Sequence, residues 1–218
     1  MNFQLRPYQE EQLQALWSYF MTKNGHPILA APTGSGKSVI PAEFIKRTMF
    51  HYPNNRFLVT THVKELIKQN YEKMQSVWPN APAGIYSAGL KQRDILNPII
   101  FGGVQSMVKM PDAFGHRDIM FVDEAHLISP NETSSYQKLI GRLRQINPKL
   151  KVIGMSATPY RAGQGMLTDG GLFTDIAHDL TSLDNFNKLV REGYLSPLIP
   201  KKTSIELDVS NVSMQAGE

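Results

Sequence analysis

Eight consecutive residues, from Ala31 to Ser38, combine the groups that bind phosphate in proteins; they read Ala-Pro-Thr-Gly-Ser-Gly-Lys-Ser. Gly34 and Gly36 permit the positive φ angles that turn successive backbone N–H groups toward phosphate oxygens. The amine of Lys37 can reach the β- and γ-phosphates of a nucleotide, and the hydroxyl of Ser38 can bind Mg²⁺. The expected phosphate-binding residues are therefore Thr33, Gly34, Ser35, Gly36, Lys37 and Ser38.

The sequence on either side of this loop has the pattern that a phosphate-binding loop requires. An apolar run from Pro27 to Ala31 predicts a strand, and the segment from Val39 to Phe50 predicts a helix whose positive end faces the phosphates. The spacing fits G-x-x-x-x-G-K-[ST], with Ala31 where the first glycine would stand. The alternative is a Gly-Ser loop that carries a lysine by chance, and the motifs downstream weigh against it.

Two adjacent carboxylates form the second chemical feature. The apolar residues from Ile119 to Val122 run directly into Asp123 and Glu124. This pattern predicts a buried strand that delivers both carboxylates to the carboxyl edge of a parallel sheet, where ligands bind. Asp123 would hold Mg²⁺ and Glu124 would polarise the attacking water. Paired carboxylates repel each other unless a cation is present, which disfavours the alternative of a solvated acidic turn.

Polar side chains at two other places suit the same site. Ser156 and Thr158 follow a predicted strand from Lys151 to Met155, so their hydroxyls can report occupancy of the γ-phosphate position. Arg6 and Gln9 begin a predicted helix; the amide can pair with an adenine edge and the guanidinium can stack on the ring. Without the phosphate loop downstream, a solvated helix start would be the simpler interpretation of Arg6 and Gln9.

Hydrophobic periodicity predicts the elements that position these groups. Helical spacing of apolar residues predicts helices over 7–20, 39–50, 63–71, 135–146 and 186–192, with a helical turn at 104–107. Apolar and β-branched runs predict strands at 27–31, 56–60, 83–87, 99–101, 119–122, 151–155 and 203–212, and the segment 90–98 reads as an exposed connection. Strands that alternate with helices predict an α/β fold with a parallel sheet.

Several residues are candidates for contact with a nucleic-acid backbone. Thr61, His62 and Lys64 follow a predicted strand, at the sheet edge where ligands bind; the alternative is a capped helix with a surface lysine. His62 has no obvious metal partner in the sequence. Gly102 and Gly103 end another strand, either to form a tight turn or to let a nucleic-acid backbone approach closely.

Composition limits the class of protein. The 218 residues are 41% hydrophobic and 19% charged, which suits a globular chain with a substantial core. We find no apolar run of the roughly 20 residues that span a bilayer and no signal-peptide pattern. The chain has no cysteine, which excludes disulfides and thiolate metal sites, and we expect a cytoplasmic enzyme. A formal net charge of +4 is compatible with a polyanionic partner, although the basic residues are scattered.

Together these motifs resemble those of the first motor domain of a superfamily two helicase or translocase. The segment from Ala31 to Ser38 matches the Walker A motif, and Asp123-Glu124-Ala125-His126 is a DEAH box. Three further motifs match in order along the chain: the adenine-sensing pair Arg6 and Gln9, the segment that tracks the nucleic-acid backbone from Thr60 to Leu66, and the coupling motif from Ser156 to Thr158.

The resemblance implies a RecA-like P-loop NTPase fold, in which a central, mainly parallel sheet carries helices on both faces. It implies ATP and Mg²⁺ as cofactors and ATP hydrolysis as the activity, with Lys37, Asp123 and Glu124 as catalytic residues. It also implies that His126, Ser156 and Thr158 couple hydrolysis to movement on a nucleic acid. The candidate nucleic-acid contacts then comprise Thr61, His62, Lys64, Gly102, Gln105 and Arg161.

Connecting residues narrow the resemblance further. The segments from Leu5 to Gln9, Thr61 to Leu66, Phe101 to Ser106 and Ser156 to Arg161 look like those of the restriction-enzyme-type III group. The bacterial RadD (YejH) proteins are similar within that group, which implies a role in DNA repair and favours DNA over RNA as the partner. A DEAH tetrapeptide also occurs in RNA helicases, but those lack the Leu-Arg-Pro-Tyr-Gln segment found here.

The same resemblance implies a division of the chain and a missing part. We expect residues 1–180 to form the ATP-binding motor domain and residues 181–218 to form a short helix and a linker. The linker would lead to a second RecA-like domain, whose arginines reach the γ-phosphate across the cleft between domains. We therefore expect feeble ATP hydrolysis by these 218 residues alone, since such an arginine contributes on the order of 10³-fold or more in rate.

Function is therefore expected to be that of an ATP-dependent DNA helicase or translocase, active in repair or recombination. Two alternatives stay open: a clamp that binds DNA under ATP control without unwinding it, and an RNA helicase. A metabolic kinase is disfavoured, because Glu124 with Ser156 and Thr158 offers water activation and signalling rather than a pocket for an acceptor substrate.

Overall fold

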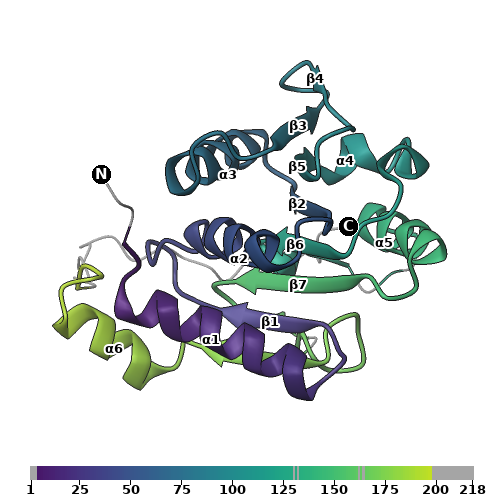
Figure 1. The fold of residues 1–218 in the computed structure, drawn as a ribbon. Helices are drawn as coiled ribbons and strands as arrows, with labels where there is room; N and C mark the ends of the chain where they lie inside the picture. Colours follow the sequence, from purple (N-terminus) through teal and green to yellow (C-terminus); the bar gives the residue numbers. More distant parts are fainter. Residues whose placement is uncertain (1–3, 130, 132, 162, 164, 198–218) are drawn as a thin grey trace, which may run out of the picture.

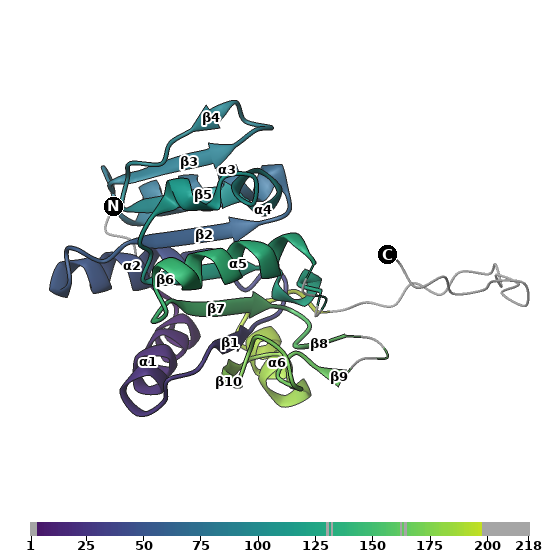
Figure 2. The same ribbon diagram turned by 90° about the vertical axis from the view of Figure 1, so that its right-hand side faces the viewer.

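The computed structural model describes residues 4–197 except 130, 132, 162 and 164. Its main sheet is built from β1 (Pro27–Ala30), β2 (Phe57–Thr61), β3 (Ala83–Ser87), β4 (Gln92–Arg93), β5 (Ile99–Gly103), β6 (Ile119–Asp123), β7 (Lys151–Ser156) and β10 (Asp175–Asp179). The strand order is β10-β1-β7-β6-β2-β5-β3-β4, and Figure 2 shows it running from β4 at the top to β10 at the bottom. Every neighbouring pair is parallel except β3 and β4.

Six α-helices accompany the sheet in the described residues: α1 (Pro7–Thr22), α2 (Val39–His51), α3 (Lys64–Val77), α4 (Val104–Met107), α5 (Ser135–Ile146) and α6 (Leu183–Arg191). The short segments η1 (Pro111–Phe114) and η2 (Ala125–Leu127) are 3₁₀ turns, and β8 (Tyr160–Arg161) pairs with β9 (Gly165–Met166) in a small hairpin. Figure 1 shows α1, α2 and α3 on one side of the sheet and α4 and α5 on the other. The expected α/β fold, with a mainly parallel sheet covered on both faces, is confirmed.

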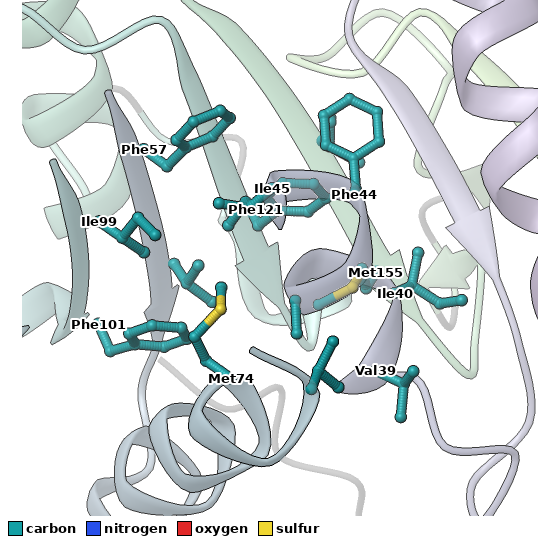
Figure 3. Close-up of a cluster of buried hydrophobic side chains, with 14 of the residues drawn as sticks. Val39, Ile40, Phe44, Ile45, Phe57, Met74, Ile99, Phe101, Phe121 and Met155 are labelled. Carbon is teal, nitrogen blue, oxygen red and sulfur yellow. The ribbon is translucent and has the colours of Figure 1, made fainter. Parts of the chain in front are cut away.

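The core forms because successive residues of a strand point to opposite faces of the sheet. Phe57 and Phe121 belong to the cluster under α1, α2 and α3, which Figure 3 shows in close-up. Leu58 and Val122, one position further along, belong to the cluster under α4 and α5. All four are fully buried or nearly so. Both faces are therefore covered, which explains why the central strands read as continuous apolar runs in the sequence.

Local sequence signals fix the ends of the helices. Pro7 opens α1, and the backbone N–H of Arg6 donates to Oε1 of Gln9 at 3.0 Å. The hydroxyl of Ser134 accepts from the backbone N–H of Gln137 at 3.4 Å, so it caps α5. Beyond α6, Gly193 has a φ of 74°, the conformation in which glycine ends helices. The helix predicted over 186–192 is thus present and starts three residues earlier, at Leu183.

The main sheet contains two strands that the sequence did not predict. The first is β10, whose sequence Asp-Ile-Ala-His-Asp has little apolar patterning. This strand is half-buried at the edge of the sheet, where it pairs with the distant β1. The segment 90–98 was predicted as a plain connection, yet it contains β4, which pairs with β3. The predicted strand at 203–212 lies outside the described residues.

In the described part of the chain, no helix combines the length and the apolar character needed to cross a membrane.

Candidate functional site

The register of three adjacent strands brings the predicted motifs to one edge of the sheet. Ala30, the last residue of β1, pairs with Ser156 at the end of β7. Met155 of β7 in turn pairs with Asp123, the last residue of β6. The phosphate loop, the two carboxylates and the Ser-Ala-Thr segment therefore leave the same edge side by side, as the sequence predicts.

The phosphate loop has the backbone geometry expected of an anion cradle. Gly34 and Gly36 have φ angles of 84° and 79°, which confirms the expectation of positive φ at both glycines. The hydroxyl of Ser35 donates to the carbonyl of Pro32 at 2.7 Å and holds the turn closed. Helix α2 begins at Val39, directly after the loop, so the positive end of its dipole lies beside the loop. This backbone fits the phosphates of a nucleotide.

The residue at the first glycine position has a packing role. Ala31 is fully buried in a cluster with Tyr8, Leu180 and Leu189, so its methyl group fills space that glycine would leave empty. Its backbone N–H donates to the carbonyl of Ser156 at 2.9 Å, and its own carbonyl accepts from Nζ of Lys37 at 3.2 Å. The lysine amine thus rests on the end of β1, beside the loop it is expected to serve.

Asp123 is held by groups from outside its own motif. Asp123 is buried, with 7% of the residue exposed. Its Oδ2 accepts from the side-chain amide of Asn70 on α3 at 3.1 Å, and its Oδ1 accepts from the backbone N–H of Glu124 at 3.1 Å. The sequence interpretation did not identify Asn70; the available signal was an amide on the apolar face of α3, three residues after Ile67 and four before Met74, both buried. A carboxylate oxygen and the hydroxyl of Ser38 are hard ligands of the kind that Mg²⁺ prefers.

Glu124 has a left-handed backbone conformation, which persists in a residue other than glycine only when the surrounding structure holds it. Its φ and ψ are 53° and 52°, in the left-handed region, which costs a residue other than glycine on the order of 1–3 kcal/mol. The residue ends β6 and precedes the turn η2, so this conformation redirects the chain at the DEAH sequence. The side chain is 29% exposed and stays accessible at the sheet edge.

A series of neighbouring polar side chains runs from Glu124 through His126 to the Ser-Ala-Thr segment. Nδ1 of His126 lies 3.4 Å from Oε2 of Glu124 and 3.0 Å from Oγ of Ser156. Oγ of Ser156 also donates to the carbonyl of Thr158 at 2.8 Å and accepts from its backbone N–H at 3.1 Å. The structure therefore brings His126, Ser156 and Thr158 together beside Glu124, and it engages Thr158 through its backbone.

Gln9 contacts the phosphate loop directly, and Arg6 is connected to it through Tyr8. Nε2 of Gln9 and the hydroxyl of Tyr8 both donate to the carbonyl of Ser35, at 3.1 and 2.7 Å. Nη1 of Arg6 donates to the hydroxyl of Tyr8 at 3.0 Å. Both ends of the Gln9 amide are thus engaged within the protein, and a base would exchange with one of these partners. Tyr8 was not among the predicted site residues, although it stands between the two that were.

The residues predicted to contact nucleic acid are spread over the neighbouring part of the edge. Thr61 of β2 pairs with Gly103 of β5, which places the two strand ends together. Thr61 is buried, and its hydroxyl accepts from the backbone N–H of Val63 at 3.4 Å. The ring of His62 meets Tyr136 edge-on with 4.7 Å between centroids, and burial lowers the pKa of His62. No group of three or more His, Cys, Asp or Glu side chains that could hold a metal occurs in the described residues.

Three further candidates have structural partners. Strand β5 ends at Gly103 and α4 starts at Val104, which is a tight turn from strand to helix. Gly102 lies inside β5, where an added Cβ would come within 2.7 Å of Met107 and 2.9 Å of the Tyr86 carbonyl. Oε1 of Gln105 accepts from the hydroxyl of Ser135 at 3.2 Å. Lys64 is exposed and lies beside Gly89.

Arg161 is turned toward the DEAH segment. Its guanidinium donates to the carbonyls of His126 and Ile128, at 3.3 and 2.5 Å. Burial lowers its pKa. In this structure Arg161 therefore braces the turn that carries His126.

Most of the chain matches one known protein family. Residues 2–161 match the family described as "Type III restriction enzyme, res subunit". The chain belongs to this family. This family match supports the expected first motor domain of a superfamily two helicase. The RecA-like fold agrees with the solved structures described below.

Among curated relatives, the chain is 26% identical over 223 residues to "Putative helicase 22" of Sulfolobus islandicus filamentous virus, covering 94% of the chain and 38% of that protein. It is 29% identical over 171 residues to "Putative mitochondrial ATP-dependent helicase irc3" of Schizosaccharomyces pombe, covering 74% of the chain and 27% of that protein. The chain thus spans well under half the length of these relatives.

Two solved structures have the same fold. The first is a nuclease-deletion mutant of the type ISP restriction-modification enzyme LlaGI with a DNA substrate mimic; the TM-score is 0.66 at 15% identity, covering 88% of this chain and 21% of that one. The second is the UvsW helicase of bacteriophage T4, with a TM-score of 0.59 at 21% identity, covering 81% of this chain and 60% of that one.

Proposed function

We propose that this chain is the ATP-binding motor domain of a DNA helicase or translocase that acts in repair or recombination. The observation that carries the proposal is the arrangement at the carboxyl edge, where the phosphate loop, Asp123 and Glu124, and Ser156 leave three neighbouring strands. Names of relatives add to it, since several are called ATP-dependent helicases. The expected similarity to RadD-type repair proteins is part of the same proposal.

ATP would bind with its phosphates in the loop. The backbone N–H groups of Gly34 to Lys37 and the amine of Lys37 would hold the phosphates, and Ser38 with Asp123 would hold Mg²⁺. When bound, Mg²⁺ neutralises charge on the phosphate oxygens. Asn70 keeps Oδ2 of Asp123 in place, and the left-handed backbone of Glu124 sets the direction of its carboxylate.

Glu124 would accept the proton of the water that attacks the γ-phosphate. His126 lies between this carboxylate and Ser156, so a change in the hydrogen bonding of Glu124 reaches the end of β7 through two side chains. Beyond Ser156 the chain continues to Arg161, which returns to the carbonyl of His126 at 3.3 Å. We propose that these contacts transmit the change at Glu124 during hydrolysis to the residues that contact the nucleic acid.

DNA is the proposed partner, contacted through Thr61, His62, Lys64, Gly102, Gln105 and Arg161. The structure of LlaGI with a DNA substrate mimic supports DNA, whereas a relative from African swine fever virus, 28% identical, is named as a putative RNA helicase. RNA is therefore the alternative substrate. Residues 181–218 would lead to a second RecA-like domain that completes the site, so the 218 residues alone would hydrolyse ATP feebly.

The test is the ATPase rate of the full-length protein beside its Glu124→Gln variant, with single-stranded, duplex or forked DNA and with RNA. We expect DNA to stimulate turnover and the variant to lose about 10²- to 10⁴-fold in kcat while still binding ATP, because general-base catalysis contributes that much. Glu72→Gln, which changes an exposed carboxylate on α3, is the matched control and should leave turnover unchanged.

Each outcome separates the candidates. Equal turnover in wild type and Glu124→Gln would contradict the role of Glu124. ATP-dependent DNA binding with negligible turnover in both proteins would favour a clamp that holds DNA without unwinding it. Stimulation by RNA alone would make RNA the substrate.

A further inference from the structure

The chain that follows α6 is held firmly in place. Gly193 turns the backbone with a φ of 74°, and the backbone N–H groups of Tyr194 and Leu195 both donate to the carbonyl of Leu189, at 2.9 and 3.2 Å. Leu189 is 1% exposed and packs in the cluster that contains Tyr8 and Ala31. The backbone position of Tyr194 is therefore fixed by a helix cap and a buried anchor.

From this position Tyr194 touches the part of the site that is expected to meet the base. Its ring meets Tyr8 edge-on, with 5.1 Å between centroids and 68° between planes. The guanidinium carbon of Arg6 lies 5.3 Å from the centroid of the Tyr194 ring. The next residue, Leu195, lies 3.5 Å from the point where a Cβ on Gly34 would stand. Tyr194 thus joins the C-terminal part of the described chain to both Arg6 and the phosphate loop.

Arg6 is exposed, and an exposed arginine samples many side-chain conformations. Here two contacts limit that freedom: the Tyr194 ring beneath the guanidinium and the hydrogen bond of Nη1 to the Tyr8 hydroxyl at 3.0 Å. A guanidinium held over one aromatic ring offers its opposite face for a second planar group.

We propose that Tyr194 is a positioning residue of the nucleotide site: it holds the Arg6 guanidinium so that the free face stacks on the purine of ATP. The proposal rests on the nucleotide site described under the proposed function. It adds a residue 33 positions beyond the end of the family match at residue 161. None of the hydrogen bonds in the described residues joins the Tyr194 side chain to the phosphate loop, so we expect its effect on binding of the base.

The test compares binding of ATP with binding of inorganic tripolyphosphate, both in the presence of Mg²⁺, by competition with a fluorescent ATP analogue. Tyr194→Leu removes the ring, and Tyr194→Phe keeps it. We expect Tyr194→Leu to weaken ATP binding about 3- to 30-fold and to leave tripolyphosphate binding unchanged, as fits the loss of one cation–π contact. Tyr194→Phe should bind ATP as wild type does. In an Arg6→Ala background, Tyr194→Leu should have no further effect on ATP binding.

Three results would overturn the proposal: equal weakening of ATP and tripolyphosphate binding, wild-type ATP affinity in Tyr194→Leu, or tighter ATP binding in that variant, which would make Tyr194 a plug of the base site. Thermal unfolding without nucleotide checks that the leucine variant is folded, and the Arg6→Ala cycle tests the proposal even if the leucine variant is destabilised.

The variant Lys37→Ala is measured alongside, as a separate test of the nucleotide site. Undiminished ATP binding by Lys37→Ala would count against the nucleotide site itself, whereas its loss together with a wild-type result for Tyr194→Leu would count against the role of Tyr194 alone.

Discussion

The two edges of the sheet use buried polar groups in different ways. At the amino edge, before β6, Arg117 is 1% exposed and its guanidinium donates to backbone carbonyls, those of Phe57, Ile95, Asn97, Pro98 and Phe114. At the carboxyl edge, the His126 side chain contacts the side chains of both Glu124 and Ser156. Backbone carbonyls are held in place by the fold, whereas side chains can change partner by rotating. The amino edge is therefore built for stability and the carboxyl edge for chemistry.

A search for the functional site by cavity volume alone would select the amino edge of the sheet, away from the predicted motifs. A hollow of about 1090 Å³ lies at the amino edge and is lined largely by apolar side chains, among them Trp17, Phe44 and Trp78. Two of its basic residues have partners: Lys46 donates to the carbonyl of Val77 at 3.3 Å, and Arg47 forms ion pairs with Glu10 and Glu43. The lining contains neither the phosphate loop nor the Asp123–Glu124 pair, so the arrangement of polar side chains locates the site better than volume does.

The largest effect on stability should come from the amino edge. Replacing Arg117 with Met removes the donor for several buried carbonyls, so we expect the free energy of unfolding to fall by about 3 kcal/mol. Urea unfolding measures this change, with Arg93→Met, on the exposed strand β4, as the control. ATP affinity of the folded protein should not change. A loss of ATP affinity at unchanged stability would place Arg117 in the functional site and break the contrast between the edges.

Gly102 tests whether a glycine at the carboxyl edge serves packing or nucleic acid. An added methyl group would come within 2.9 Å of a backbone carbonyl in β3, so we expect Gly102→Ala to lower the free energy of unfolding by about 1–3 kcal/mol. Gly141→Ala, in α5 with no atom within 4 Å of the added Cβ, should raise it slightly and serves as the control. Weaker DNA binding by Gly102→Ala without a change in thermal unfolding would support the nucleic-acid interpretation instead.

Asn70 tests whether the carboxyl edge depends on support from α3. Loss of its amide frees Oδ2 of Asp123, so we expect Asn70→Ala to weaken Mg²⁺-dependent ATP binding about 10-fold, as is typical when a group that orients a metal ligand is removed. Gln75→Ala, on the same helix but bonded to the carbonyl of Ala81, is the control. Titration of Mg²⁺ at fixed ATP measures the effect. Equal Mg²⁺ dependence in the two variants would refute it.

The smallest predicted effect is a pH dependence at the amino edge. Burial, with the charges of Arg144 and Lys151 nearby, lowers the pKa of His26 to about 4. The unfolded chain binds this proton below about pH 6.5 and the folded chain only near pH 4, so the free energy of unfolding falls as the pH drops across that range. His26→Gln keeps an acceptor for the backbone N–H of Val152 without a titrating group. The decrease in urea midpoint between pH 6.5 and 4 should be smaller in this variant; equal decreases would show that His26 does not contribute.

Sequence motifs predicted most of the carboxyl edge because their chemistry is local. The positive φ angles of Gly34 and Gly36, and the strand that delivers Asp123, each follow from neighbouring residues. Asn70 and Tyr194 escaped prediction because each meets the site across more than 50 positions of sequence, Asn70 at Asp123 and Tyr194 at Arg6. Strand β10 escaped for the same reason, since its pairing with β1 and not its composition makes it a strand. These features depend on contacts between residues far apart in the sequence, which local sequence patterns do not reveal.

The central claim is that the carboxyl edge, and not the hollow at the amino edge, binds ATP. The most direct test is the affinity of the protein for Mg²⁺-ATP after removal of one lysine amine at each edge, Lys37→Ala against Lys46→Ala. We expect Lys37→Ala to lose at least about 10-fold in affinity, since its amine would face the β- and γ-phosphates, and Lys46→Ala to bind as wild type does. Equal affinities of the two variants, or a loss confined to Lys46→Ala, would contradict this account of the molecule.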